Sequence, residues 1–108
     1  MNPINLSIAR DFSITPGGRK AAEGKFSGET FRKELLEPRI KTAIETKNIL
    51  KCDLDGCLGY PSSFLDESFG VLGRQLKSQN IDIFDFMILK CDDEPSLIDE
   101  IYKYIQEK

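Results

Sequence analysis

The side chains best able to do chemistry gather in one stretch, between positions 53 and 67. They are two carboxylates, a thiol, a phenol and two hydroxyls: Asp53, Asp55, Cys57, Tyr60, Ser62 and Ser63. Aspartates at this spacing can attack a phosphate ester and transfer a proton. A serine at the start of a helix can instead cap that helix, or accept a phosphoryl group that the helix end stabilises. The stretch therefore predicts either phosphate-transfer chemistry or a regulatory loop.

The composition excludes several other functions. The chain has no histidine, which removes Ser–His and Cys–His catalysis, and its three cysteines are too few for a typical structural zinc site. We expect these cysteines to be buried thiols in a reducing compartment. The net charge of -3 argues against nucleic-acid binding, which needs a basic surface. We expect no metal and no cofactor in a regulatory protein of this composition.

Length and hydropathy predict a soluble globular protein. The 108 residues suit a single domain over 1–108, and 40% hydrophobic with 31% charged residues is ordinary for such a domain. No apolar run approaches the roughly 20 residues that cross a bilayer. The first residues lack the charged start and apolar core of a signal peptide. We therefore expect a cytoplasmic location without membrane association.

The periodicity of apolar residues predicts alternating strands and helices. Strands are expected over 4–14, 49–54 and 81–89, and helices over 31–44, 65–78 and 92–105, with a kink or break at Pro38. Strands separated by helices imply crossover connections and a parallel or mixed sheet. Asp53 and Asp55 then follow the middle strand, and Ser62 and Ser63 open the next helix, with Ser63 and Asp66 spaced as a capping pair.

A glycine-rich loop over 15–28 precedes the first long helix. Its spacing fails the phosphate-binding P-loop pattern, because Arg19 stands where a glycine is required and Phe26 follows Lys25. Glycine-rich backbone can still cradle an anion through its N–H groups. The loop remains either a solvated connection or an anion site that includes Arg19.

The segment Asp53-Leu54-Asp55-Gly56 resembles the first motif of the haloacid dehalogenase phosphotransferases. That resemblance implies a small magnesium-dependent phosphatase, with Asp53 as nucleophile and Asp55 as acid and base. Cys57 departs from the threonine of that motif. The 52 residues before Asp53 also depart from the family, whose chains usually begin close to the nucleophile.

A longer resemblance joins several motifs. They are Pro16-Gly17-x-Arg19, Ser27-Gly28-Glu29-x-Phe31-Arg32, Asp53-Leu54-Asp55-Gly56, Gly59-Tyr60 and Ser63-Phe64-Leu65-Asp66-Glu67-x-Phe69-Gly70. Together they resemble the prokaryotic STAS-like family of uncharacterised domains, over residues 8 to 105. The segment 53–64 also aligns without gaps with the regulatory serine loop of STAS domains, the fold of the anti-sigma factor antagonists.

This resemblance implies an α/β fold, with a four- to five-stranded mixed sheet and helices packed mainly on one face. It also implies a non-catalytic protein-binding module whose partner is a histidine-kinase-like ATPase or kinase. Carried over by position, the phosphorylated residue is Ser62. Pro61 and Phe64 depart from the family's aspartate and glycine, which changes the charge and stiffness of the loop.

The expected interaction or anion-binding loop combines the glycine-rich segment with the stretch after the middle strand. Its residues are Arg19, Arg32, Asp55, Gly56, Gly59, Tyr60, Ser62 and Ser63. If the two arginines are functional, we expect them to flank Ser62, since both lie near the glycine-rich loop. The phosphotransferase remains the alternative, and the burial and contacts of Asp53 and Asp55 discriminate between the two.

Overall fold

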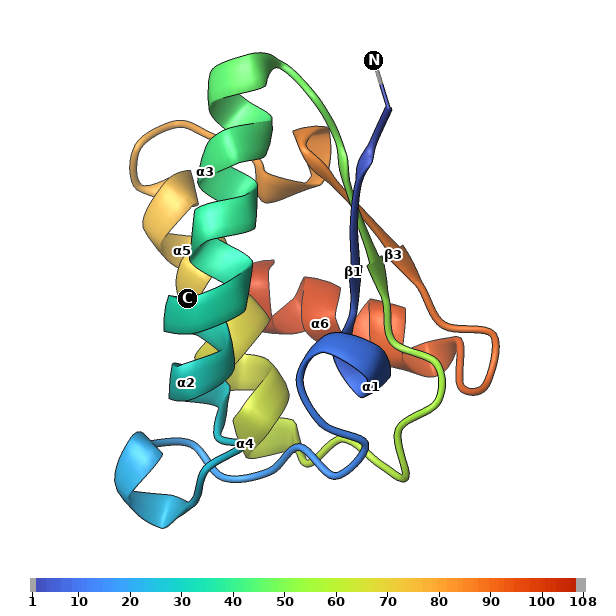
Figure 1. Ribbon diagram of the computed structural model, residues 1–108. Helices are drawn as coiled ribbons and strands as arrows, with labels where there is room; N and C mark the ends of the chain where they lie inside the picture. Colours follow the sequence, from blue (N-terminus) through green and yellow to red (C-terminus); the bar gives the residue numbers. More distant parts are fainter. Residues whose placement is uncertain (1, 107–108) are drawn as a thin grey trace.

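The computed structural model describes residues 2–106, which form an α/β fold around a small parallel sheet. Strands β1 (Ile4–Ser7), β2 (Leu50–Asp53) and β3 (Met87–Lys90) pair in the order β1-β2-β3, with every pair parallel (Figure 1). The expected central position of the middle strand is confirmed. The resemblance implied four to five strands in a mixed sheet, whereas the sheet within residues 2–106 has three strands, all parallel. Two of these strands are also shorter than their apolar runs.

The N-terminal strand ends at Ser7, although the alternating pattern continues to Ile14. The Ser7 hydroxyl accepts a hydrogen bond from the amide of Arg10 at 3.2 Å and thereby caps the short helix α1 (Ile8–Asp11). The Asp11 carboxylate in turn accepts the Ser7 amide at 2.9 Å. This reciprocal capping turns the chain away from the sheet, as serine caps do at helix starts.

The run 81–89 also yields a strand of only four residues. The Asp82 side chain accepts the amide of Phe84 at 2.9 Å and starts the 3₁₀ turn η4 (Ile83–Asp85). Aspartate commonly bonds to backbone two residues on and so competes with strand pairing. Ile83 consequently enters the core from a turn, and Phe84 packs partly buried against that core.

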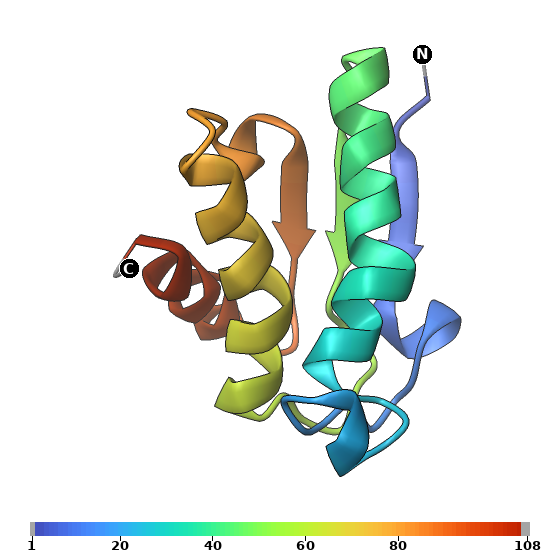
Figure 2. The same cartoon turned by 90° about the vertical axis from the view of Figure 1, so that its left-hand side faces the viewer.

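Helices cover one face of the sheet, as expected (Figure 2). One long helical segment joins α2 (Gly28–Phe31) and α3 (Glu37–Thr46), and a second joins α4 (Ser62–Leu65) and α5 (Val71–Lys77). The short turn η1 (Ala21–Glu23) precedes α2, and α6 (Ser96–Gln106) packs beside the second segment. None of these helices is long and apolar enough to cross a membrane within residues 2–106.

Each long segment contains one widened, π-helical turn, η2 (Arg32–Leu36) in the first and η3 (Asp66–Gly70) in the second. Pro38 explains the first, because it has no N–H for the carbonyl of Glu34 and its ring would crowd that carbonyl. The expected kink or break at Pro38 is therefore absorbed by the widened turn, and the helical segment continues from Gly28 to Thr46.

Phenylalanines lock the two long segments together. Phe31, Phe64 and Phe69 are fully buried, and the Phe31 ring lies 5.6 Å from that of Phe64 and 5.8 Å from that of Phe69. Burying a phenylalanine contributes on the order of 2 kcal/mol, and aromatic pairs add to this. This cluster fixes the start of α4, and therefore the position of Ser62.

Candidate functional site

The loop after β2 (residues 54–61) is anchored at its base. Leu54 is buried, and its amide donates to the carbonyl of Lys90 at 2.8 Å. The Tyr60 hydroxyl turns inward and donates to the carbonyl of Leu54 at 2.6 Å. Burial raises the pKa of Tyr60 above its ordinary value, so the phenol remains protonated and keeps donating. Tyr60 therefore shapes the loop from below.

Cys57 belongs to the same anchor. Its thiol donates to the carbonyl of Ser13 at 3.3 Å, and its Sγ lies 3.0 Å from the Tyr60 hydroxyl oxygen. Burial raises the pKa of the Cys57 thiol, and burial likewise raises the pKa values of Cys52 and Cys91. All three cysteines are free thiols with reduced thiolate character. The expected burial is confirmed for Cys52 and Cys91, whereas Cys57 is only half-buried.

Asp53 and Asp55 organise the turn that starts the loop. Oδ1 of Asp53 accepts the amide of Asp55 at 2.9 Å. The Asp55 carboxylate accepts Nζ of Lys90 at 2.6 Å and the amide of Asp93 at 2.9 Å. The Gly56 amide donates back to Oδ2 of Asp93 at 3.1 Å, and Gly56 has a φ of +95°, which favours glycine. The turn is therefore tied to the loop that follows β3.

This geometry does not suit the phosphotransferase alternative. Hydrogen bonds from the Asp93 amide and from Lys90 lower the pKa of Asp55 to about 2, far from the near-neutral value that a general acid needs. Both Asp55 oxygens already accept hydrogen bonds. Among residues 2–106, no three histidine, cysteine, aspartate or glutamate side chains are placed to hold a metal ion.

The low pKa of Asp55 predicts a pH-dependent contribution to stability. Because the folded-state pKa of about 2 lies below the ordinary value, the contribution is complete above about pH 4 and is lost as pH falls through about 2. We expect Asp55→Asn to lower the free energy of unfolding at pH 7, and this deficit to shrink towards pH 2. Urea unfolding at pH 7, 4 and 2 measures it.

The control for this experiment is Asp85→Asn, a change at an exposed aspartate for which the described residues supply no ion pair. It should leave the free energy of unfolding nearly unchanged at each pH. An Asp55→Asn deficit of equal size at pH 7 and pH 2 would contradict the assigned contacts.

A buried ion pair joins the two long helical segments at their π-helical turns. Arg32 and Glu67 are only 7% and 4% exposed, and Nη2 of Arg32 lies 3.0 Å from Oε2 of Glu67. Nε of Arg32 also donates to the Glu67 carbonyl at 3.0 Å, and Nη1 contacts Glu37 at 2.7 Å. The structure thus places Arg32 in the helix contact, where its guanidinium is occupied by the protein's own groups.

Arg19 takes a different position, at the start of the second helical segment. Nη1 of Arg19 lies 2.8 Å from Oδ2 of Asp66, whose other oxygen contacts Arg74 at 2.8 Å. The Arg19 side chain is 41% exposed. Asp66 is one helical turn after Ser62, so Arg19 does lie beside the Ser62 region, whereas Arg32 does not share that surface.

The backbone of the glycine-rich loop is occupied by the chain's own carboxylates. The amide of Arg19 donates to Glu23 at 2.9 Å, and the amide of Ala21 donates to Glu29 at 2.9 Å. The Gly28 amide donates to the carbonyl of Gly18 at 2.8 Å. These contacts close the loop on itself and leave these N–H groups unavailable to cradle an external anion.

The second helical segment begins at Ser62, with Pro61 at the N-cap position. Proline offers no side-chain acceptor there, and the expected capping by Ser63 with Asp66 is not found, because Asp66 pairs with Arg19 and Arg74. Ser62 is exposed and Ser63 is half-buried. A helix start without a side-chain cap leaves its positive end open to an added negative group.

The surroundings of Ser62 include acidic and phenolic groups from α6. The Tyr104 hydroxyl donates to Glu100 at 2.6 Å, and this bond is the main cause of a raised Tyr104 pKa. The nearby Ser62 side chain lowers the Tyr104 pKa and so partly offsets that rise. Ser62 therefore sits where the start of α4 meets α6, and a change of charge at Ser62 acts on both.

The loop also presents exposed apolar side chains that the sequence analysis did not select. Leu58 is 79% exposed and Ile14 is 51% exposed, and the Leu58 amide donates to the Ile14 carbonyl at 2.8 Å. Beside them is a shallow hollow of about 430 Å³, lined by Thr15, Pro16, Leu58, Gly59, Tyr60 and Pro61. We refer to Ile14, Leu58, Gly59, Pro61 and Ser62 as the loop surface.

Leu58 could have been recognised as an apolar residue in a turn, outside the helical and strand periodicities. Nothing in the sequence pattern separates Ile14 from a strand residue, because it continues the alternation that begins at Ile4. Of the expected loop residues, the structure brings Gly59 and Ser62 to the loop surface, with Arg19 nearby. It places Asp55 and Tyr60 beneath the loop as supports.

Comparison with known proteins gives one match. A family model described as a STAS-like domain of unknown function matches residues 27–84, which is more than half of the chain. The matched segment includes the buried Arg32–Glu67 pair, the aspartate turn and the loop up to the start of α4. Searches of the curated proteins and of the solved structures returned no significant match.

Proposed function

Because the chain belongs to the STAS-like domain family, we propose that it is a non-catalytic regulatory module that binds a partner protein through the loop surface. The observation that carries the proposal is the exposure of Leu58, at 79%, beside Ile14 and a shallow hollow. Apolar side chains held outward by an anchored loop are typical of protein-binding surfaces. The anchors at Tyr60 and Asp55 pre-organise this loop, which lowers the entropic cost of docking.

Phosphorylation of Ser62 is the proposed switch. A phosphoryl group would add about -1.5 to -2 charges at the edge of the loop surface. The open positive end of the helix favours that charge, while Glu100 opposes it and Arg19 lies one turn away, paired to Asp66. By resemblance, the kinase and partner is a histidine-kinase-like ATPase, and the added charge changes which partner binds.

Binding through the loop surface predicts that Leu58→Asp removes the partner. We expect at least a tenfold loss of captured partner, because a buried anchor at an interface contributes 1.4 kcal/mol or more. The measurement is affinity capture from the native host, with the captured proteins quantified by mass spectrometry. The fold should be intact, because Leu58 makes little contact with the core.

Tyr102→Asp is the matched control, since Tyr102 is a 52% exposed apolar residue on α6. It should capture the partner at the wild-type level. Ser62→Glu should change the captured set in the way that phosphorylation does, whereas Ser62→Ala should not. Equal capture by wild type and Leu58→Asp would reject the loop surface, and Ser62 unmodified under every growth condition would reject the switch.

A further inference from the structure

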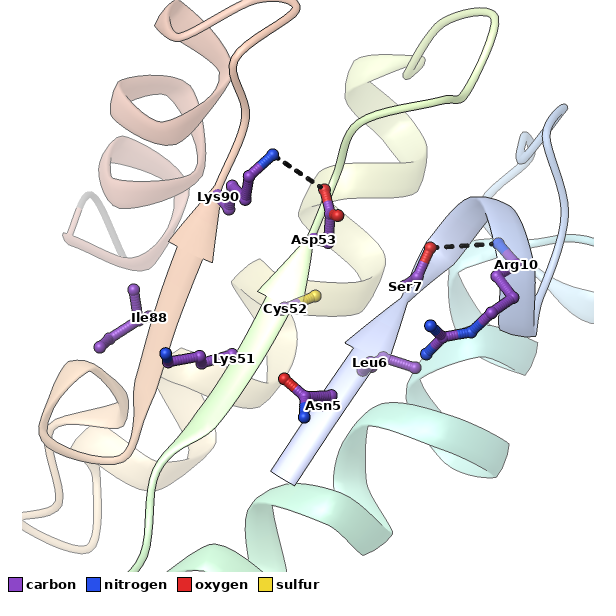
Figure 3. A pocket seen from close by; sticks show the side chains of 9 residues that line it. All are labelled: Asn5, Leu6, Ser7, Arg10, Lys51, Cys52, Asp53, Ile88 and Lys90. Atoms are coloured by element: carbon purple, nitrogen blue, oxygen red, sulfur yellow. Dashed lines mark hydrogen bonds and ion pairs between the residues drawn. The ribbon is translucent and has the colours of Figure 1, made fainter. Parts of the chain in front are cut away.

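The uncovered face of the sheet is the largest feature that the proposed function leaves unused. Six side chains from the three strands point outward in two rows across the sheet (Figure 3). Asn5, Lys51 and Ile88 form one row, and Ser7, Asp53 and Lys90 form the other. Together with Arg10 they line a hollow of about 420 Å³.

A bare face is unusual for a sheet of this kind. All-parallel sheets occur almost only where both faces are covered, whereas antiparallel sheets often leave one face to water. Here the helices cover one face only, and Ile88 is 52% exposed on the other. An apolar side chain on an uncovered parallel sheet indicates that this face is covered in an assembly.

The charges on the central strand are self-complementary. Lys51 and Asp53 are two residues apart on β2, so both point to the open face. No described residue forms an ion pair with Lys51. Asp53 is 41% exposed and lies 4.0 Å from Lys90, which contacts Asp55 more closely, at 2.6 Å. One cation and one anion therefore remain largely free for a partner.

We propose that the open face binds a second copy of this chain. In a two-fold dimer whose axis runs across the strands at the level of Cys52, each strand lies over its own copy in the opposite direction. Lys51 of each copy then faces Asp53 of the other copy. Across the same interface, Asn5 faces Ser7, and Ile88 lies against the aliphatic stem of Lys90. Stacked sheets lie about 10 Å apart, a separation that a lysine and an aspartate can bridge.

The charges also select this axis over the other possible one. A two-fold axis parallel to the strands would place Lys51 opposite Lys51 and Asp53 opposite Asp53, and both contacts repel. An isologous interface requires each charged group to meet its complement at an equal distance from the axis. A cation and an anion two residues apart on the central strand meet this requirement only when the strands run in opposite directions.

A second copy fits this face better than an unrelated helix. A purely basic partner would be repelled by Lys51, Lys90 and Arg10, and a purely acidic partner would be repelled by Asp53 on the central strand, next to Lys51. The face is small, so we expect a weak, micromolar dimer that dissociates as salt concentration rises. It is separate from the loop surface, and each protomer of the dimer keeps Leu58 exposed.

A charge exchange tests the proposal in the full chain. Lys51→Glu places glutamate opposite aspartate and should give a monomer, and Asp53→Lys places lysine opposite lysine and should also give a monomer. Mixing the two variants restores both attractive pairs and should give a heterodimer. Sedimentation of wild type, each variant and the mixture, over a range of protein concentrations at low salt, measures this.

Two further variants keep the test decisive. Asp53→Lys also removes the bond to the Asp55 amide, so if it fails to fold, Ile88→Arg replaces it and should also give a monomer. Leu58→Asp alters the loop surface only and should remain a dimer. A wild type that is monomeric at every concentration would overturn the proposal, as would a dimer unaffected by Lys51→Glu and Ile88→Arg. Loss of the dimer in Leu58→Asp alone would move the contact elsewhere and equally overturn it.

Discussion

Replacing Arg32 by methionine is expected to lower the free energy of unfolding by about 3–5 kcal/mol, because it leaves a buried carboxylate without its main partner. Glu67 is 4% exposed, and Nη2 of Arg32 lies 3.0 Å from its Oε2. The other cations in contact with Glu67 are farther away and more exposed, Lys20 at 3.4 Å and Arg19 at 3.9 Å. The total free energy of unfolding of such a domain is about 5–15 kcal/mol, so a loss of this size threatens folding itself.

The double variant Arg32→Met with Glu67→Met separates the two parts of this effect. Removing both charges abolishes the unpaired buried carboxylate. We therefore expect the double variant to recover most of the stability that Arg32→Met loses. Lys33→Met is the surface control. It removes an exposed ion pair with Glu29, which solvent screens, so the free energy of unfolding should hardly change.

Urea unfolding of the wild type, the single variants and the double variant measures these differences. If the double variant is as unstable as Arg32→Met, the other contacts of the guanidinium matter more than its pairing with Glu67. Those contacts are with Glu37 and with the carbonyl of Glu67. If Arg32→Met lowered the free energy of unfolding by less than about 1 kcal/mol, that result would contradict the burial of the ion pair.

This prediction changes the interpretation of a family motif. Arg32 and Glu67 belong to the motifs that carry the resemblance, and Arg32 was predicted from the sequence to be part of an interaction or anion-binding loop. Both residues lie within the matched segment 27–84. The structure indicates that they hold the two long helical segments together at their π-helical turns, so this part of the family pattern maintains the fold that presents the loop surface.

Gly28→Ala is the second large effect, with an expected loss of about 2 kcal/mol. A Cβ at this position would lie 2.7 Å from the backbone oxygen of Phe64 and 2.9 Å from Cβ of Glu67. Backbone cannot move aside as a flexible side chain can, so the two helical segments would have to separate. That separation would also disturb the contact between Phe31 and Phe64.

Gly59→Ala is the matched control, because a Cβ there meets nothing within 4 Å. It makes the same chemical change and reduces the entropy of the unfolded chain to a similar extent. Thermal unfolding should therefore show a clear fall in the midpoint temperature for Gly28→Ala and almost none for Gly59→Ala. Equal midpoints would mean that the segments tolerate a wider separation at this crossing.

Local sequence signals predicted much of the fold and a smaller part of the site. The central strand is confirmed over Leu50–Asp53, with Leu50 and Cys52 on its buried face and Leu54 buried directly after it. The first long helix begins earlier than expected, after Ser27, whose hydroxyl accepts the Thr30 amide at 3.1 Å. The predicted strands over 4–14 and 81–89 were too long, because turn-forming residues compete with the alternating apolar pattern in both runs. Ser7 and Asp82 both favour turns, but the alternation of apolar residues outweighed them in the prediction.

In the stretch 53–67, the sequence predicted the order of the structural elements but not the roles of the side chains. Its order along the chain, a strand followed by a turn and a helix starting near Ser62, follows from periodicity, glycine and proline, and is confirmed. The roles of its side chains depend on residues far away in the sequence. Asp55 supports a turn because Lys90 and Asp93 meet it, and Leu58 is exposed because the loop rests on Tyr60.

The sequence by itself determined the alternation of strands and helices, because periodicity and capping act over a few neighbouring residues. Only the tertiary structure decided that Arg32 is buried, and that Arg19 lies beside the start of α4. The physical reason is that burial and ion pairing depend on which distant segments pack together, and the crossing at Gly28 and the two π-helical turns set that packing.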